Sequence, residues 1–184
     1  MIYFISDMHF GHTGSLHWPN GNARDFPDVQ TMNQTIIDNW NSIVTNEDTV
    51  YCLGDFSYKI STSTLKYIFQ SLKGKIILIK GNHDGQTLKA NQQAPRFESV
   101  HDLLEIEYNS IHFILCHYPL ESWRLKEKGS IHLHGHTHGG KSTHDMTEKP
   151  NRMDVSVEAI NYTPISIEEI ITKLNLNKGT LGAV

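Results

Sequence analysis

Cysteine is scarce in this chain, which carries only Cys52 and Cys116 among its 184 residues. Two cysteines argue against a disulfide framework or a thiolate metal site, and both stand inside apolar runs. We therefore predict that both are small core residues and that the protein resides in a reducing cytoplasm.

Long apolar runs are also lacking, since no stretch approaches the roughly 18 uninterrupted apolar residues of a membrane span. The first segment, MIYFISDMHF, has neither a basic region nor a cleavage site, and its apolar part ends at Asp7 and His9. We expect a first strand here rather than a signal peptide, and no association with a membrane.

Positive charge is in short supply, because the formal net charge is -4 at pH 7. This balance gives no support for a protein that grips nucleic acid through a broad basic surface, although it leaves a local basic patch open. The length and an apolar fraction of 38% are typical of one soluble globular domain. We expect a loose tail from about residue 175.

Apolar runs rich in β-branched residues predict buried strands in this chain. The runs that precede polar motifs are Ile2–Ile5, 49–53, Lys75–Ile79, Ile111–Cys116 and 131–133. Helical patterns at 29–44 and 62–72 separate the first three runs. This βαβαβ order implies parallel strands and an α/β fold.

The second half of the chain favours antiparallel strands. Leu103–Tyr108 and Ile111–Cys116 are joined by two residues that suit a tight hairpin, Asn109 and Ser110. A further strand is expected at 153–159, and a last helix opens near Ser166. Two long irregular segments, 10–28 and 139–152, each follow a polar motif, and we expect them to shape a substrate pocket.

Histidine is abundant, with 12 in the chain, and many of the histidines directly follow predicted strands. The motifs at these strand ends are Asp7-x-His9, Gly54-Asp55, Gly81-Asn82-His83-Asp84, His117 and Gly135-His136-Thr137-His138. Open α/β sheets bind ligands beyond the carboxyl ends of their strands, so these side chains are expected to converge there. Glycines beside them allow the backbone to turn.

Carboxylate, amide and imidazole groups together suit Mn²⁺, Zn²⁺, Fe or Ni²⁺ better than a metal that prefers thiolates. Each motif taken alone also fits an ordinary polar turn. Their fixed order, with one motif at each strand end, favours a metal site over a set of unrelated turns.

This ordered set resembles the calcineurin-like metallophosphoesterase superfamily, whose core motifs are all present. Other segments resemble a compact bacterial and phage subgroup: Arg24 with Phe26, the helix around Trp40, and residues 47–50, 117–123 and 164–170. The resemblance covers nearly the whole chain. It implies a four-layer αββα sandwich of two mixed sheets flanked by helices.

The resemblance also implies a site with two divalent metal ions, Mn²⁺ first, with Zn²⁺, Fe or Ni²⁺ as alternatives. Asp7, His9 and His138 would hold one metal, Asn82, His117 and His136 would hold the other, and Asp55 would bridge them. A hydroxide bridging the metals would attack the phosphorus.

Three neighbouring residues would take catalytic roles by the same resemblance. His83 would donate a proton to the leaving oxygen or stabilise charge on the phosphoryl group, and Asp84 would orient its ring. The amide of Asn82 would reach toward phosphate while it ligates metal.

Four residues are candidate substrate contacts: Arg24, His12, Tyr118 and Trp123. Arg24 and His12 also fit solvated loop positions, and the two aromatic residues also fit packing roles. His132 and His134 alternate along a strand and are expected to be core or supporting residues. The remaining histidines, His17, His101, His112 and His144, give no signal above surface or packing roles.

Hydrolysis of a phosphodiester is the leading interpretation, with a nucleotide, a cyclic nucleotide or a nucleic-acid end as substrate. A phosphomonoesterase or protein phosphatase is the second interpretation, because the same metals could perform that reaction. A non-catalytic scaffold on the same fold is a third. Such a scaffold would be expected to lose metal ligands or His83, and all of these residues are present.

Overall fold

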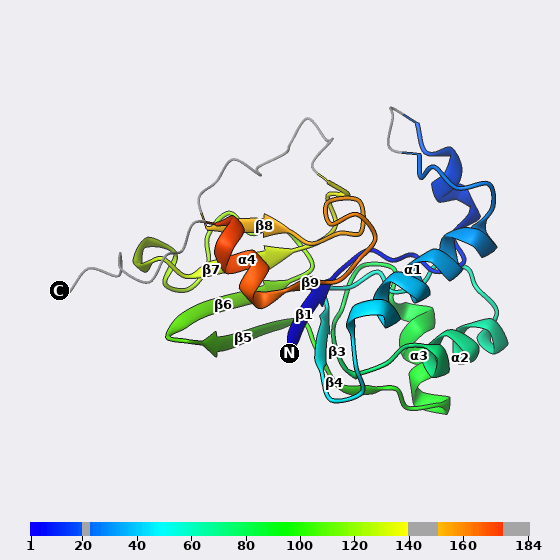
Figure 1. Ribbon diagram of the computed structural model, residues 1–184, viewed down its shortest axis with the longest axis horizontal. Coiled ribbons are helices and arrows are strands. Elements are labelled where there is room, and N and C mark those ends of the chain that lie inside the picture. Colours follow the sequence, from blue (N-terminus) through cyan, green and yellow to red (C-terminus); the bar gives the residue numbers. More distant parts are fainter. Residues whose placement is uncertain (20–22, 140–150, 175–184) are drawn as a thin grey trace.

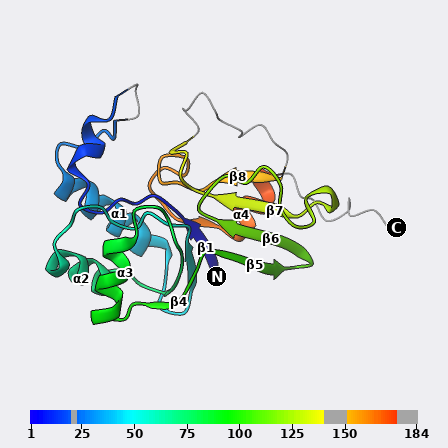
Figure 2. The ribbon, with the colours of Figure 1, turned by 180° about the vertical axis from the view of Figure 1, so that it is seen from behind.

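The computed structural model describes residues 1–19, 23–139 and 151–174. Within these ranges the strands form a five-stranded sheet of order β4-β3-β2-β1-β9 and a four-stranded sheet of order β5-β6-β7-β8. Figures 1 and 2 show the four-stranded sheet on one side of β1 and the helices α1, α2 and α3 grouped on the other.

The first sheet is parallel except at one edge. Its strands are β1 (Ile2–Ile5), β2 (Thr49–Cys52), β3 (Lys75–Ile79), β4 (Phe97–His101) and the short β9 (Ile165–Ser166). The first four pair in parallel, and β9 pairs antiparallel to β1. Because Ile5 pairs with Cys52, and Cys52 with Leu78, the carboxyl ends of β1, β2 and β3 meet at one edge.

The crossover helices of this sheet are α1 (Val29–Ile43), α2 (Thr62–Ser71) and α3 (Gly85–Gln93). Side-chain oxygens cap the first two, since Asp28 accepts from the amide of Thr31, and Ser61 from that of Thr64. Helix α1 buries Met32, Ile36, Ile37 and Trp40, so a stripe at helical spacing faces the sheet.

The second sheet consists of β5 (Leu103–Tyr108), β6 (Ile111–Cys116), β7 (Ile131–His134) and β8 (Arg152–Asp154). β5 and β6 pair antiparallel, whereas β6, β7 and β8 are parallel. The hairpin predicted between β5 and β6 is confirmed: Asn109 and Ser110 have φ values of 49° and 63°, as a two-residue primed turn requires.

The two sheets share one hydrophobic core, to which both contribute. The rings of Phe4 on β1 and Phe113 on β6 stack with centroids 6.4 Å apart, which joins the sheets directly. Helix α4 (Ile167–Lys173) contacts β9 and β1, and the capping box of Ser166 and Glu169 fixes its start. Two 3₁₀ turns, η1 (Thr13–His17) and η2 (Lys126–Lys128), complete the elements.

The predicted α/β class, with two mixed sheets flanked by helices, is confirmed. Most predicted strands and helices agree with the structure to within about two residues. The strand predicted at 153–159 is wrong beyond Asp154, because the chain enters turns there. The antiparallel character expected for the second half is limited to the β5–β6 and β1–β9 pairs among the described strands.

Two predicted features are not described: the tail from residue 175, and most of the segment 139–152 with His144. Among the described helices, none is long and apolar enough to span a bilayer. Both cysteines are free and buried, as predicted.

Candidate metal centre

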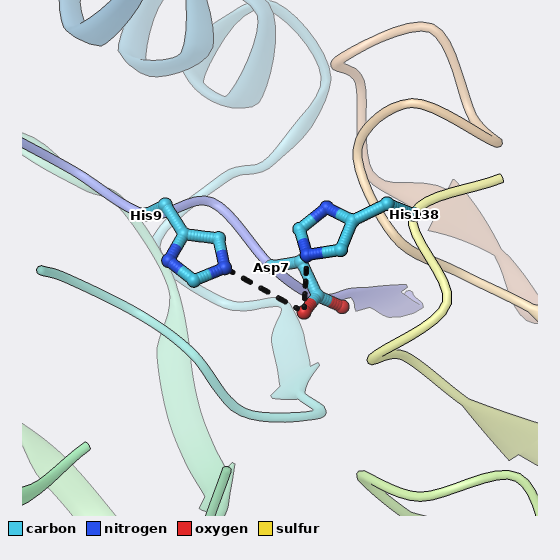
Figure 3. Close-up of side chains that lie close together, drawn as sticks. All are labelled: Asp7, His9 and His138. Atoms are coloured by element: carbon cyan, nitrogen blue, oxygen red, sulfur yellow. Dashed lines mark ion pairs between the residues drawn. The ribbon is translucent and has the colours of Figure 1, made fainter. Parts of the chain in front are cut away.

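The predicted metal ligands come together where strands of both sheets end. Asp7 and His9 follow β1, Asp55 follows β2, and His138 follows β7. Figure 3 shows the carboxylate of Asp7 between the rings of His9 and His138. The nearer oxygen, Oδ1, is 3.9 Å from Nε2 of His9 and 3.6 Å from Nε2 of His138. These three residues therefore present ligand atoms to one point.

Asp55 links this group to a second one. Its Oδ2 is 3.5 Å from Nε2 of His9 and 3.7 Å from Nε2 of His117. Ligand atoms of Asp7, Asp55 and His117 also lie within 4.8 Å of one another, as do those of Asp7, His9 and His138. One carboxylate thus stands between two histidine clusters, as a bridging ligand must.

Asn82 and His136 complete the second group. Oδ1 of Asn82 is 3.0 Å from Nε2 of His117, and the rings of His117 and His136 are 5.1 Å apart. The backbone amide of His136 donates to Oδ2 of Asp7, which ties β7 to β1. Both Asn82 and His136 are exposed, whereas the ligands below them are mostly buried. The second group therefore forms the open side of the centre.

Left-handed backbone occurs at most of the predicted ligands. Five non-glycine ligands adopt left-handed φ values: Asp7 (56°), His9 (47°), Asp55 (53°), His136 (70°) and His138 (49°). Such conformations cost roughly 1–3 kcal/mol each and persist where the surroundings dictate them, commonly at functional sites. The turn that the sequence assigned to flanking glycines is thus made largely by the ligands themselves.

Gly135 is needed for close packing rather than for a turn. A Cβ at this position would lie 1.9 Å from Oγ of Ser6 and 2.2 Å from Oδ2 of Asp7. Only glycine lets β7 approach β1 this closely, so Gly135 brings the two sheets together at the centre. Gly54 does supply a turn, with a φ of 93°.

Several buried polar atoms in the centre have no hydrogen-bond partner in the described chain: Oδ1 of Asp7 and both ring nitrogens of His9. Buried unsatisfied polar atoms are costly, on the order of 1–3 kcal/mol each. A divalent cation between Oδ1 of Asp7 and Nε2 of His9, which lie 3.9 Å apart, would satisfy these two atoms. Carboxylate with imidazole is a ligand set that such cations accept. The residues therefore fit a metal.

The electrostatics of the protein alone also favour a cation. Burial raises the pKa of Asp7 to about 6, although neighbouring histidines and Ser6 oppose that rise. Burial, with the charge of Arg24, lowers the pKa of His9, which keeps its ring neutral. A neutral imidazole can ligate metal, and a cation would restore the ionised form of Asp7.

His83 lies at the exposed edge of the centre, with 40% of its side chain exposed. Its Nε2 is 4.0 Å from Oδ2 of Asp55, and its backbone amide donates to Oδ1 of the same residue. The ring is thus both exposed to solvent and close to a predicted ligand, which a proton donor to a substrate in this centre would require.

The role predicted for Asp84 needs correction. Its carboxylate accepts hydrogen bonds from the backbone amides of Gly81, Asp55 and Phe56, at 2.8 to 2.9 Å. The residue is buried, and its described bonds go to these loops rather than to the ring of His83. Asp84 therefore joins the loops after β2 and β3 and acts on the centre through Asp55.

Arg24 is neither an exposed contact for phosphate nor a solvated loop residue, contrary to both interpretations of the sequence. Only 2% of the residue is exposed, and its guanidinium donates to the carbonyl oxygens of Asp7 and Met8 and to Glu158. These bonds occupy the donors that would grip a phosphate.

Trp123 is also misassigned as a candidate substrate contact. Its ring is buried, lies 5.2 Å from that of His132, and donates through Nε1 to Ser130. The packing alternative is correct. His132 and His134 are buried within β7, as expected, and each has a ring nitrogen near a backbone carbonyl.

Two candidate substrate contacts remain beside the centre. Tyr118 is 44% exposed, and its ring lies 5.1 Å from that of His117 and 5.0 Å from that of His136. On the other side, the ring of His12 is 5.3 Å from that of His9. Burial lowers the pKa of His12 to about 4.

Three residues of the centre were not predicted from the sequence: Trp18, Tyr58 and Glu158. The ring of Trp18 is 4.7 Å from that of His138, and the ring of Tyr58 is 4.9 Å from that of His83. Oε1 of Glu158 accepts a hydrogen bond of 2.9 Å from His138. None belongs to a recognisable motif, and Tyr58, three residues after Asp55, offered only its proximity as a signal.

A family model described as a calcineurin-like phosphoesterase superfamily domain matches residues 1–155. An uncharacterized protein of Methanocaldococcus jannaschii is 36% identical over 182 residues, covering 96% of this chain and 93% of that protein. The gene 66 protein of Mycobacterium phage L5 is 29% identical over 163 residues, covering 74% of this chain and 76% of that protein.

A crystal structure of a protein of unknown function from Aquifex aeolicus is also similar. It superposes with a TM-score of 0.73 at 28% identity, and the match covers 94% of this chain and 98% of that one. The similarity therefore extends over most of each chain rather than over isolated motifs.

Proposed function

Because the chain belongs to the calcineurin-like phosphoesterase superfamily, we propose that it is a phosphodiesterase that works with two divalent metal ions. Asp7, His9 and His138 would hold one ion, Asn82, His117 and His136 would hold the other, and Asp55 would serve both. Such ions neutralise charge on the phosphoryl group and lower the pKa of bound water. Mn²⁺ is the first choice, and Zn²⁺, Fe or Ni²⁺ suit the same ligands.

The observation that carries this proposal is the set of unpartnered atoms around Asp7. Its Oδ1 and both nitrogens of His9 are buried without a described hydrogen-bond partner. Oδ2 of Asp55 lies 3.5 Å from His9 on one side and 3.7 Å from His117 on the other. A single cation would leave one of the two histidine clusters without a metal ion, so the arrangement supports two ions.

The exposed edge supplies the groups for catalysis. His83 stands beside Asp55 and donates a proton to the leaving oxygen, which is worth roughly a hundredfold or more in rate. Asn82 is neutral, so its amide binds beside an anionic phosphate without adding repulsion. Asp84 maintains this edge by holding the amides of Gly81 and Asp55.

A nucleotide or a nucleic-acid end is the proposed substrate. Tyr118 is 44% exposed beside His117 and His136, so its ring offers a surface on which a base can stack. A net charge of -4 argues against a broad grip on a long duplex. We propose that the chain acts as one domain in the cytoplasm, in keeping with its free cysteines.

Parallel assays test the reaction class. Protein stripped by a chelator is reloaded with Mn²⁺, Zn²⁺, Fe²⁺ or Ni²⁺ and given bis(p-nitrophenyl) phosphate or p-nitrophenyl phosphate. Metal-dependent turnover of the diester is expected. Turnover of the monoester alone would overturn the diester preference in favour of a phosphatase. No turnover of either ester with any metal would favour a scaffold.

A matched pair of variants tests the substrate. Tyr118→Leu should raise the KM for a reactive nucleotide diester about fivefold or more, because one stacked base contributes roughly 1–3 kcal/mol. Tyr67→Leu is the control, since Tyr67 is an exposed tyrosine on α2. Equal KM values for the two variants would remove Tyr118 from the substrate site.

A further inference from the structure

Glu158 lies in the turn after β8, and one of its carboxylate oxygens accepts hydrogen bonds from two different side chains. Nδ1 of His138 donates to its Oε1 at 2.9 Å. Nε of Arg24 donates to the same oxygen at 2.9 Å, and Nη2 lies 2.8 Å from it. Three segments far apart in sequence, around residues 24, 138 and 158, therefore meet at a single carboxylate oxygen.

Arg24 is itself fixed from several directions. Nη2 donates to the carbonyl oxygen of Asp7 at 2.6 Å and Nη1 to that of Met8 at 2.8 Å. The guanidinium also lies 5.3 Å from the ring centroid of Trp18, in a cation–π contact. The planar fork of arginine suits such simultaneous bonds, so the guanidinium holds Glu158 in register with the backbone that carries Asp7.

The bond to Glu158 determines which nitrogen of His138 is available. A neutral imidazole has one N–H donor and one acceptor, and Nδ1 must carry the hydrogen in order to donate to a carboxylate. Nε2 is then the acceptor, and it is the nitrogen that lies 3.6 Å from Oδ1 of Asp7. Figure 3 shows this edge of the ring turned to Asp7. Carboxylates that orient metal-binding histidines in this way raise their basicity.

We propose that Glu158, held by Arg24, is the positioning residue of one of the two metal sites: it fixes the tautomer and orientation of His138. This inference rests on the proposed two-metal function. It concerns one site only, because His117 in the other cluster has a different support, with Nδ1 2.7 Å from the carbonyl oxygen of Leu53. Loss of Glu158 therefore weakens one metal equivalent and spares the other.

Metal titration of stripped protein tests this inference without any substrate. Mn²⁺ binding is followed by calorimetry, and Co²⁺ is added in parallel because its visible spectrum reports the ligand geometry. The variants are Glu158→Ala, which removes the acceptor, and Glu158→Gln, which keeps an oxygen for Nδ1 but loses the charge. Glu168→Ala is the matched control, because Glu168 is an exposed glutamate on α4.

In Glu158→Ala we expect one of the two equivalents to bind roughly 10- to 100-fold more weakly, with a changed Co²⁺ spectrum. Glu158→Gln should lose less affinity, and Glu168→Ala should match the parent protein. If Glu158→Ala does not fold, as judged by circular dichroism, the comparison of Glu158→Gln with Glu168→Ala decides.

Three results overturn the inference, and they are distinguishable from one another. Normal affinity and spectrum in Glu158→Ala, or equal weakening of both equivalents, would show that Glu158 does not position His138. Failure of the parent protein to bind metal would overturn the two-metal function as well.

Discussion

At the scale of single residues, two predicted metal ligands stand in conformations and surroundings that polar residues ordinarily avoid. Asp7 and His9 combine left-handed backbone with buried polar atoms that lack described partners. Both features oppose folding, and a bound cation would offset the second of them. Sequence motifs identified these residues because their chemistry is explicit in the residue types.

Three residues were assigned wrong roles from the sequence because their burial could not be predicted. Arg24, Asp84 and Trp123 each carry a group that a substrate site could use, but all three are buried and bonded to backbone or neighbouring side chains. Glu158 belongs to no motif, and only the meeting of three segments reveals its contact with His138. Which polar group is buried depends on tertiary structure, so a linear pattern cannot show it.

A substitution of His83 should distinguish its role in turnover from the role of the metal ligands in metal binding. His83→Ala should leave metal content unchanged, because its ring stands at the exposed edge beyond the ligands. Turnover should fall by roughly a hundredfold or more, as is typical when a general acid is lost. Elemental analysis and steady-state kinetics on the same preparation check both points. Full activity in this variant would remove His83 from the mechanism.

Asp84 should behave as a structural residue of the loops rather than as a partner of His83. Asp84→Asn turns an amide NH₂ group toward backbone donors and should cost about 1–3 kcal/mol in the free energy of unfolding of stripped protein. Asp102→Asn is the control, since 85% of the Asp102 side chain is exposed. Urea unfolding measures both, and equal stabilities would contradict the assigned bonds.

At the scale of elements, the predicted strands are correct where apolar residues run together. The short apolar runs of β1, β3 and β6, rich in β-branched residues, indicate buried strands directly. Helix α3 was missed because its segment is polar and buries only Thr87 and Ala90 among its own residues. β4 has one buried residue, Phe97, and β9 is two residues long, so neither has a pattern that periodicity detects.

Close approach of β7 to β1 gives a prediction at this scale. Gly135→Ala should destabilise the protein by several kcal/mol or reduce metal affinity, because a Cβ would overlap Ser6 and Asp7. Gly85→Ala is the matched change, at the start of α3 where a Cβ meets nothing within 4 Å. Gly85→Ala should be neutral or should stabilise the protein by up to about 1 kcal/mol.

Thermal unfolding with and without Mn²⁺ compares the two variants. A Gly135→Ala protein with the stability and metal affinity of the parent would refute the tight contact between β7 and β1.

At the scale of the whole molecule, two sheets bring their strand ends to one centre. β1, β2 and β3 belong to the first sheet, whereas β6 and β7 belong to the second. The sequence predicted that polar motifs would converge beyond strand ends, but not that the ligands would be divided between two sheets. That division makes the centre depend on how the sheets pack, through contacts such as Phe4 with Phe113.

The proposed function requires that Asp55 join two metal ions in one centre. Titration of Mn²⁺ into stripped protein, for the parent chain and for Asp55→Asn, tests this most directly. We expect about two equivalents per parent chain and weakened binding of both in the variant, because Oδ2 of Asp55 lies near both His9 and His117. A single equivalent in the parent chain, or two undisturbed equivalents in Asp55→Asn, would contradict it.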